Sequence, residues 1–315
     1  MIDLEGAWAA FQGSTDGTVG LEEEFAILEP GTLKLVSRFE ELRDAAVATD
    51  PGLAQSISGE LIASEIEIRS GRGEALATAM AAQRDFRRRL FALATDRDAA
   101  LGATGTHPWA DYREQRIIET EHYQRLNREL QYIVWRNNTF SLHVHVGVRG
   151  AERAVRTCDR LRPVLPLLLA ISANSPYLDG QDSGLHSART ATFTRLFPRC
   201  GIPEPFGDWA TFAGYVDFLQ RTGSIVEYTQ VWWSVRPHTS FGTVEVRICD
   251  AQSSAAESEA LDRLKAWTGA EIALPELNGA QRQRRMIEQG AGPSEVYAAV
   301  VRETHATYLQ EETVP

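Results

Sequence analysis

The run Gly20–Phe25 reads Gly-Leu-Glu-Glu-Glu-Phe and lies within Thr18–Leu28, where the apolar residues predict a β-strand. Side chains alternate along a strand, so Glu22 and Glu24 share one face while Glu23 points to the other. Two carboxylates side by side on a strand repel each other, and a divalent cation bound between them would remove that cost. Taken alone, such a run is more often a solvated acidic edge strand.

A second strand with the same character is predicted at Ser64–Ser70. Glu65, Glu67 and Arg69 share one face there, and isoleucines occupy the other. The segment therefore adds a second pair of carboxylates on one strand. The alternative is an exposed sheet face on which Glu and Arg form weak cross-strand pairs.

A third strand, Ser141–Val148, carries two histidines. His143 and His145 share a face with Gly147, while leucine and valines form the apolar face. Two histidines at positions i and i+2 can point into one site, as a metal or metal–nucleotide site requires. A single buried histidine is usually a satisfied core residue, but two on one face favour a functional site.

A fourth strand is predicted at Thr243–Asp250. Alternation places Thr243, Glu245, Arg247 and Cys249 on one face and the aliphatic residues on the other. A carboxylate beside a guanidinium on an interior face could bind a metal and hold the phosphate next to it. The two side chains could also pair only with each other.

Two further arginines are candidates for anion binding. Arg189 follows the turn-rich loop Ser172–Gly184, and its planar guanidinium matches two phosphate oxygens. A helix-surface position is the alternative, and it is the preferred interpretation for Arg195. Arg236 lies in the aromatic and basic segment Trp232–His238, which is predicted to form a pocket wall.

Composition narrows the class of protein. The chain has 315 residues, 43% of them hydrophobic, and a net charge of −11, which argues against general binding to nucleic acid or anionic membranes. No apolar run approaches the roughly 20 residues that cross a bilayer, and the first residues do not resemble a signal peptide. Three widely spaced cysteines indicate reduced thiols, with Cys249 as a core residue. These features predict a cytoplasmic protein.

The rest of the chain is predicted to be mostly helical. Leu33–Val36 is expected to return as a hairpin partner of the first strand, and the arginines at 87–89 are interpreted as a solvated helix face. No repeat or linker is evident, so a single catalytic domain is predicted over 1–315, with its motifs in 17–257 and a helical segment in 258–315. The predicted helices cover 37–48, 74–99, 117–135, 151–173 (interrupted by prolines), 209–221 and 253–307 (broken at Pro275 and at 290–293).

Five motifs in this order resemble the carboxylate–amine ligase family that is related to type 2 glutamate–cysteine ligases. They are Gly-x-Glu-x-Glu-Phe at 20–25, Glu-Leu…Glu-Ile at 60–68, His-Val-His-Val-Gly-Val at 143–148, Ser-Pro…Asp-Ser-Gly…Ser-x-Arg-Thr at 175–190, and Trp-Trp-x-x-Arg-Pro-His with Gly-Thr-x-Glu-x-Arg-x-x-Asp at 232–250. The resemblance covers roughly residues 17–257.

The resemblance implies an α+β fold, a curved antiparallel sheet with helices on its outer face, as in glutamine synthetase. It implies an enzyme that uses ATP and Mg²⁺, or Mn²⁺, to activate a carboxylate, such as the γ-carboxylate of glutamate, as an acyl phosphate that an amine then attacks. Such chemistry depends on positioning and charge neutralisation by metals and arginines. Cysteine is one candidate for the amine.

The resemblance also implies roles for individual residues. Arg189 and Arg247 would contact phosphate, Arg236 would contact phosphate or the substrate carboxylate, and these three are the candidate catalytic residues. His145 would contact the nucleotide. Glu60 matches a family position, but its parity relative to Glu67 leaves its role open. The implied metal ligands are Glu22, Glu24, Glu67, His143 and Glu245.

The chain departs from the family pattern in places that bear on the substrate. Glu65 stands where an uncharged residue is expected, and the region after Leu261 is shorter than expected. A ligase for another amino acid or specialised metabolite, and a non-catalytic nucleotide- or amino-acid-binding relative, are the alternatives. A zinc hydrolase built on His143 and His145 is disfavoured because carboxylates outnumber nitrogen and sulfur ligands. Pairing of exposed sheet edges would give a homo-oligomer.

Overall fold

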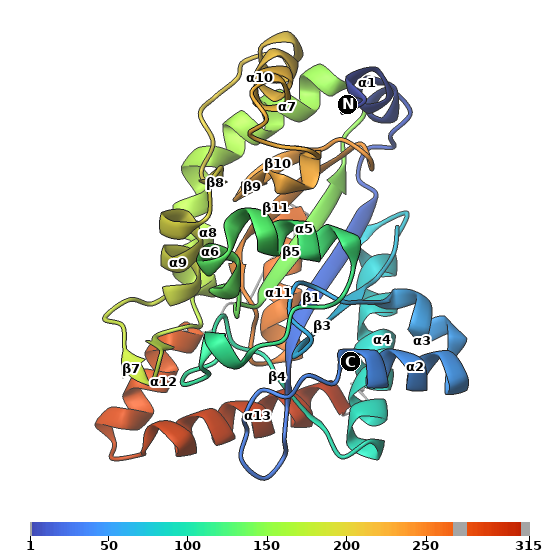
Figure 1. The fold of residues 1–315 in the computed structure, drawn as a ribbon. Helices are drawn as coiled ribbons and strands as arrows, with labels where there is room; N and C mark the ends of the chain where they lie inside the picture. Colours follow the sequence, from blue (N-terminus) through green and yellow to red (C-terminus); the bar gives the residue numbers. More distant parts are fainter. Residues whose placement is uncertain (1, 267–275, 310–315) are drawn as a thin grey trace.

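A seven-stranded antiparallel sheet forms the centre of the computed structural model, which describes residues 2–266 and 276–309. The strand order is β10-β11-β5-β1-β3-β2, and β4 pairs with β1 beyond the end of β5 (Figure 1). The strands are β1 Val19–Leu28, β2 Ile57–Ser58, β3 Glu65–Arg69, β4 Ala100–Gly102, β5 Ser141–Gly147, β10 Val235–His238 and β11 Thr243–Asp250. Two small sheets pair β6 Tyr177–Leu178 with β7 Gln181–Asp182 and β8 Cys200–Gly201 with β9 Trp232–Trp233.

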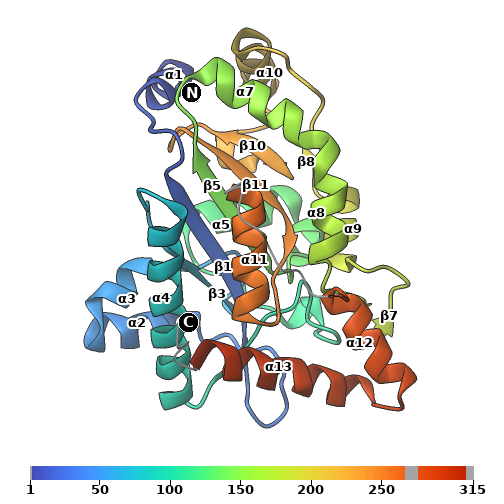
Figure 2. The same cartoon turned by 180° about the vertical axis from the view of Figure 1, so that it is seen from behind.

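Helices cover one face of this sheet. Seen from behind, α4, α11 and α13 lie across the sheet and α7 and α8 run beside them, whereas α5 and α6 lie over the opposite face (Figures 1 and 2). The predicted fold class, an antiparallel sheet with helices packed on its outer face, is confirmed. The helices are α1 Leu4–Gln12, α2 Phe39–Thr49, α3 Pro51–Ser56, α4 Leu76–Asp96, α5 Glu121–Leu130, α6 Tyr132–Trp135, α7 Ala151–Leu161, α8 Leu165–Ser172, α9 Ala188–Leu196, α10 Trp209–Arg221, α11 Ala255–Ala266, α12 Gly279–Glu288 and α13 Pro293–Leu309.

Most of the predicted helices agree with these bounds. One predicted helix and the predicted hairpin differ in detail. The predicted helix over 117–135 is divided at Gln131, whose φ of 45° ends α5 and precedes α6. Leu33–Val36 returns toward β1, but only Leu35 forms a bridge, opposite Leu28. The predicted break at Pro275 lies outside the described residues. Among the described residues, no helix is both long and apolar enough to span a membrane.

The strand register separates a polar face from an apolar one. Glu22 of β1 lies opposite Arg69 on one side and His143 on the other, and Glu24 lies opposite Glu67. Directly opposed residues of an antiparallel pair share a face, so these side chains gather on the face away from α4 and α11. The intervening aliphatic side chains, such as Leu21, enter the core beneath those helices.

A β-bulge in β11 overturns one prediction. Val246 lies opposite Val144 and Cys249 lies opposite Leu142, so three steps along β11 match two steps along β5. The extra residue reverses the alternation beyond it. The prediction that Cys249 shares the face of Glu245 is therefore wrong. Cys249 is fully buried among apolar residues, as expected for a core thiol.

The arginines at 87–89 do not form a uniformly solvated face. Arg87 is 1% exposed and faces the back of the sheet, where its guanidinium contacts Glu23 at 3.3 Å and Glu259 at 2.6 Å. Arg88 and Arg89 remain at or near the surface. The solvated interpretation is thus wrong for Arg87, because a buried guanidinium needs anionic partners that only the folded chain supplies.

Asp262 of α11 is a buried carboxyl that feels the charges of Arg87, Glu23 and Glu259. It is fully buried, and neither carboxylate oxygen has a hydrogen-bond partner. Burial, reinforced by the charges of Glu23 and Glu259, outweighs Lys265 and Arg87 and raises the pKa of Asp262 to about 7.

Asp262→Asn should therefore change how stability depends on pH. The pKa in the folded state lies above the unfolded value of 3.8, so the contribution of Asp262 to stability is lost as the pH rises from about 4 to about 7. The variant should exceed the wild type in unfolding free energy by up to about 4 kcal/mol near pH 8, and by much less near pH 4. Urea unfolding at the two pH values measures this. An equal difference at both would contradict the assignment.

Candidate active site

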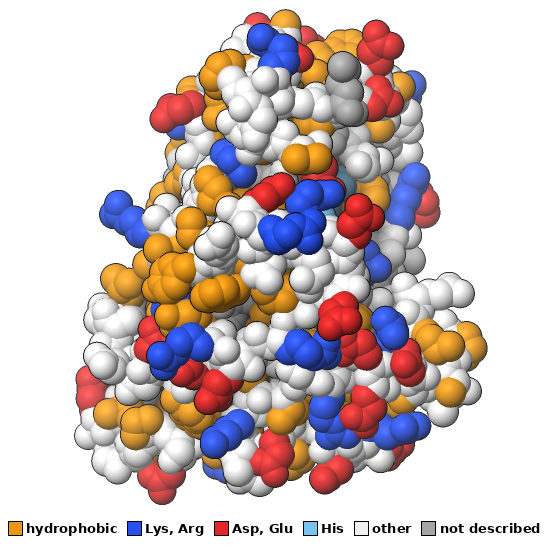
Figure 3. Space-filling model, viewed as in Figure 1, with side chains coloured by type: hydrophobic (Ala, Val, Ile, Leu, Met, Phe, Trp, Pro, Cys, Tyr) orange, Lys and Arg blue, Asp and Glu red, His pale blue; other side chains and the backbone are white. Residues whose placement is uncertain are grey.

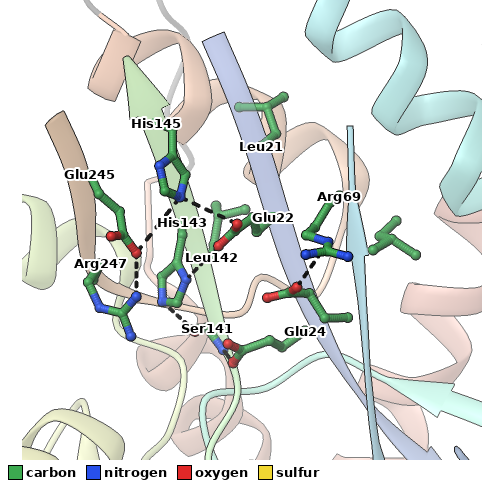
Figure 4. A network of polar contacts seen from close by, with 12 residues as sticks. Leu21, Glu22, Glu24, Arg69, Ser141, Leu142, His143, His145, Glu245 and Arg247 are labelled. Atoms are coloured by element: carbon green, nitrogen blue, oxygen red, sulfur yellow. Dashed lines mark hydrogen bonds and ion pairs between the residues drawn. The ribbon is translucent and has the colours of Figure 1, made fainter. Parts of the chain in front are cut away.

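Four neighbouring strands, β1, β3, β5 and β11, supply the polar side chains of the face that lies away from α4 and α11, several of which converge in Figure 4. The structure brings together the predicted metal ligands on this face, next to Arg236 of β10 and Arg247. The shared face contains Glu22, Glu24, Glu65, Glu67, Arg69, His143, His145 and Glu245.

Glu22 lies between the two histidines. One carboxylate oxygen is 3.2 Å from Nδ1 of His143, and the other is 3.3 Å from Nε2 of His145. Burial would raise the pKa of Glu22, but His145 and His143 hold it well below its usual range. Conversely, burial lowers the pKa of His143, whereas Glu245 and Glu22 outweigh burial and raise that of His145.

Glu245 is held by two guanidinium groups. Nε of Arg236 donates to it at 2.6 Å, and Arg247 forms a short ion pair with its other oxygen. Arg236 also donates to the backbone carbonyl of Val231 at 2.6 Å, so much of its hydrogen-bonding capacity is engaged within the fold. Burial alone would raise the pKa of Glu245, but the two arginines keep it well below its usual range.

The other half of the face is an acidic corner made by Glu24, Glu60, Glu65 and Glu67. Glu67 has one nearby cation, Arg69, at 3.6 Å. Burial and mutual repulsion raise the pKa of Glu60 to about 8 and raise those of Glu65 and Glu67 well above their usual range. Parity leaves the role of Glu60 open because this residue lies in the irregular segment between β2 and β3, where strand alternation does not apply.

These residues fit a divalent cation. Among the described residues, three groups each offer three ligand atoms that lie within 4.8 Å of one another. Oε2 of Glu65 is buried without a hydrogen-bond partner, and oxygen-rich groups of this kind suit Mg²⁺ or Mn²⁺. The groups are Glu22/Glu67/His143, Glu22/His145/Glu245 and Glu24/Glu60/Glu67.

The family model for glutamate–cysteine ligase family 2 matches residues 18–276. A protein of Rubrobacter xylanophilus, "Putative glutamate--cysteine ligase 2-2", is 41% identical over 281 residues, which cover 88% of this chain and 71% of that protein. The chain belongs to glutamate–cysteine ligase family 2. A relative from Gloeobacter violaceus, "Putative glutamate--cysteine ligase 2", is 37% identical over 81% of this chain and 68% of its own length.

Membership in glutamate–cysteine ligase family 2 makes the chain one of the ATP-dependent carbon–nitrogen ligases that act on small molecules. The predicted family resemblance is thereby confirmed. The chain spans about two thirds of the length of these two relatives.

Two solved structures share the fold of this family member at low sequence identity. A bifunctional glutathione synthetase from Pasteurella multocida superposes with a TM-score of 0.68 at 13% identity, over 96% of this chain and 54% of that one. A glutamate–cysteine ligase from Francisella tularensis, solved in complex with AMP, gives 0.62 at 10% identity, over 95% and 90%. The antiparallel sheet with its helices is thus shared with enzymes of distant sequence.

A cavity of about 870 Å³ opens at the end of the polar face where β1 begins. Its lining includes Glu22, Arg69 and His145, together with Phe241 and Thr243 of the neighbouring hairpin. Nδ1 of His145 lies 3.0 Å from Oγ1 of Thr243. The cavity therefore joins a space of ligand size to the carboxylate–histidine half of the site.

The polar face is covered by α5 and α6, which we call the strap (121–135). Figure 1 shows the strap in front of the sheet, and Figure 3 shows charged side chains of both signs over it. Tyr123 donates to the carbonyl of Gly59 at 3.0 Å on one side, and His122 lies 2.8 Å from Glu227 on the other. The start of the strap is thus attached to segments on two sides of it.

Arg189 of α9 lies near the same strands but in a different environment from Arg247. Its guanidinium donates to the backbone carbonyls of Arg247 and Ile248 at 3.2 and 3.3 Å and lies 3.7 Å from Asp250. Its Nε is buried without a partner. A role for Arg189 in contacting phosphate stays a prediction. Arg195 is exposed, in agreement with the surface interpretation.

Proposed function

We propose that this protein joins a carboxylate substrate, glutamate, to an amine through a γ-glutamyl amide bond, using ATP and Mg²⁺. The observation that carries the proposal is the gathering of Glu22, Glu24, Glu67, His143 and Glu245 on one buried sheet face, next to arginines and an open cavity. Buried like charges at this density are costly unless cations neutralise them. A face of this composition therefore supports metal-assisted phosphoryl transfer.

The three ligand groups of the face would hold the metal ions. Bound Mg²⁺ or Mn²⁺ would neutralise negative charge on the transferred phosphoryl group. Glu22 belongs to two of the three groups and would be shared between them. The acidic corner, which has few cations of its own, would gain most from a bound ion.

The cavity beside His145 is the proposed site of the nucleotide. Phe241, which is exposed and lines the cavity, offers an aromatic surface for a purine ring. Arg247 points from β11 toward the ligand groups, and Arg247 and Arg189 are proposed to contact phosphate, while Arg236 is proposed to contact phosphate or the substrate carboxylate. Arg236 would also hold Glu245 in place, because it donates to Glu245 and to the carbonyl of Val231.

The proposed reaction proceeds in two steps, phosphorylation of the carboxylate and attack by the amine. A glutamate carboxylate oxygen forms a bond to the terminal phosphorus of ATP while the bond to ADP breaks, which gives an acyl phosphate and ADP. An amine nitrogen then bonds to the acyl carbon, phosphate leaves, and the nitrogen loses a proton. Cysteine is the candidate amine named by relatives of the family, and another amino acid or specialised metabolite is the alternative.

The test is ADP release from ATP and Mg²⁺, with single amino acids and then with pairs of amino acid and amine. We expect ADP that depends on glutamate and an amine together, and γ-glutamyl product by mass spectrometry. ADP release that depends on a different carboxylate would correct the substrate. Magnesium-dependent ATP binding without turnover by any pair would indicate a binding-only relative, and the absence of ATP binding would refute the proposal.

A further inference from the structure

Glu23, the middle residue of the acidic run on β1, faces the back of the sheet rather than the site. It is 3% exposed, and three side chains from helices donate to its carboxylate. Gln83 donates at 2.9 Å, Arg87 at 3.3 Å and the hydroxyl of Tyr308 at 3.1 Å. We call these four residues the Glu23 clamp. The clamp is distinct from the ligand groups, although it shares a strand with them.

The clamp is itself fixed from behind. Arg87 donates to Glu259 of α11 at 2.6 Å, and Arg84 donates to the same carboxylate at 2.8 and 2.9 Å. The guanidinium of Arg87 also lies 4.9 Å from the ring centre of Tyr308. Helices α4 and α13, which are far apart in sequence, therefore meet at the Glu23 carboxylate, and α11 is joined to it through Arg87.

Geometry connects the clamp to the opposite face of the strand. Glu22 and Glu24 are the immediate neighbours of Glu23, and the pleat of a strand ties the directions of successive side chains together. A buried carboxylate that accepts three hydrogen bonds cannot rotate without leaving polar groups unpaired, which is costly. Fixing Glu23 thus restricts the backbone on which two ligands sit, at a place where ligand groups repel one another.

We propose that Glu23 is a positioning residue, and that the Glu23 clamp holds Glu22 and Glu24 in the arrangement that binds the divalent cation. This inference rests on the proposed metal site. It gives the C-terminal helix α13 a role in the active site from the opposite side of the sheet, through the hydroxyl of Tyr308. Groups that orient metal ligands commonly contribute a 10- to 100-fold factor to metal affinity.

Tyr308→Phe is the main test, and Tyr297→Phe is its matched control. Both residues lie in α13 and are buried, but Tyr297 packs against His107 and Trp109 instead of Glu23. The probe is Mn²⁺ alone, titrated into folded protein and followed by its electron paramagnetic resonance signal. Tyr308→Phe should raise the Mn²⁺ dissociation constant about 5-fold or more, whereas Tyr297→Phe should leave it within about 2-fold of the wild type.

A second variant tests the same proposal if Tyr308→Phe folds poorly. Arg87→Lys retains a positive charge but loses the planar fork that joins Glu23 to Glu259, so it should also weaken Mn²⁺ binding. If both variants fold, lower the melting temperature and yet bind Mn²⁺ as tightly as the wild type, the clamp is only structural and the proposal is overturned. A wild-type protein that binds no Mn²⁺ would overturn the proposed metal site itself.

Discussion

Glu22→Gln should lower the rate of ADP formation by at least about 100-fold while the protein stays folded. Glu22 belongs to two of the three candidate ligand groups and lies between His143 and His145. Gln has nearly the same shape but lacks the charge, so a bound metal ion would lose a strong ligand and both histidines would lose their anionic partner. Steady-state ADP release at saturating Mg²⁺ measures the effect.

Glu119→Gln is the control for Glu22→Gln, because Glu119 is exposed and lies outside the site. It should leave ADP formation within about 2-fold of the wild type. Circular dichroism and melting temperature would show whether each variant is folded. A folded Glu22→Gln protein that keeps more than about a tenth of the wild-type rate would refute the role of Glu22 as a shared metal ligand.

Arg87→Met should cost about 3 to 5 kcal/mol of unfolding free energy, the usual penalty for breaking a buried ion pair. Arg87 is the partner shared by Glu23 and Glu259, and methionine fills similar space without a positive charge. We expect the lower end of the range because Glu259 keeps its contacts with Arg84, and Glu23 keeps those with Gln83. Urea unfolding measures the loss as a lower transition midpoint.

Arg88→Met provides a control from the adjacent residue of the same helix. Arg88 is 48% exposed and pairs with Asp85 on the surface, so its loss should change the unfolding free energy by no more than about 0.5 kcal/mol. Comparable effects of the two substitutions would mean that Arg87 contributes no more than a surface arginine. That result would also remove the physical basis of the Glu23 clamp.

The sequence was sufficient to predict the face on which the ligands gather, because alternation is a local property of a strand. Glu22, Glu67 and His143 lie on three different strands, yet each was placed by parity within its own segment, and the antiparallel register brings them together. Alternation says nothing about a residue that lies between strands, as Glu60 does. The position of Glu60 in the acidic corner therefore became apparent only from the structure.

Two other features depended on contacts that are distant in sequence. The bulge between Val246 and Cys249 is defined by pairing with β5, about a hundred residues earlier, and nothing in the alternating sequence of β11 marks it. Arg87 has neighbours of the same charge, so composition favoured a solvated interpretation. Its burial follows from Glu23 and Glu259, which reach it from other elements. Charges that are satisfied only by tertiary contacts cannot be recognised from local pattern.

The contact between Tyr308 and Glu23 joins residues that are 285 positions apart. β1 is synthesised before α13, so the hydroxyl that completes the bonding of Glu23 becomes available only after the intervening residues have been made. β5, which pairs with β1, and β11, which pairs with β5, are also made after β1. The acidic strand therefore remains without these partners until they have been synthesised, and such long-range pairing folds slowly and leaves strand edges exposed. The bonding of Glu23 is thus completed only after all four strands of the polar face have been synthesised.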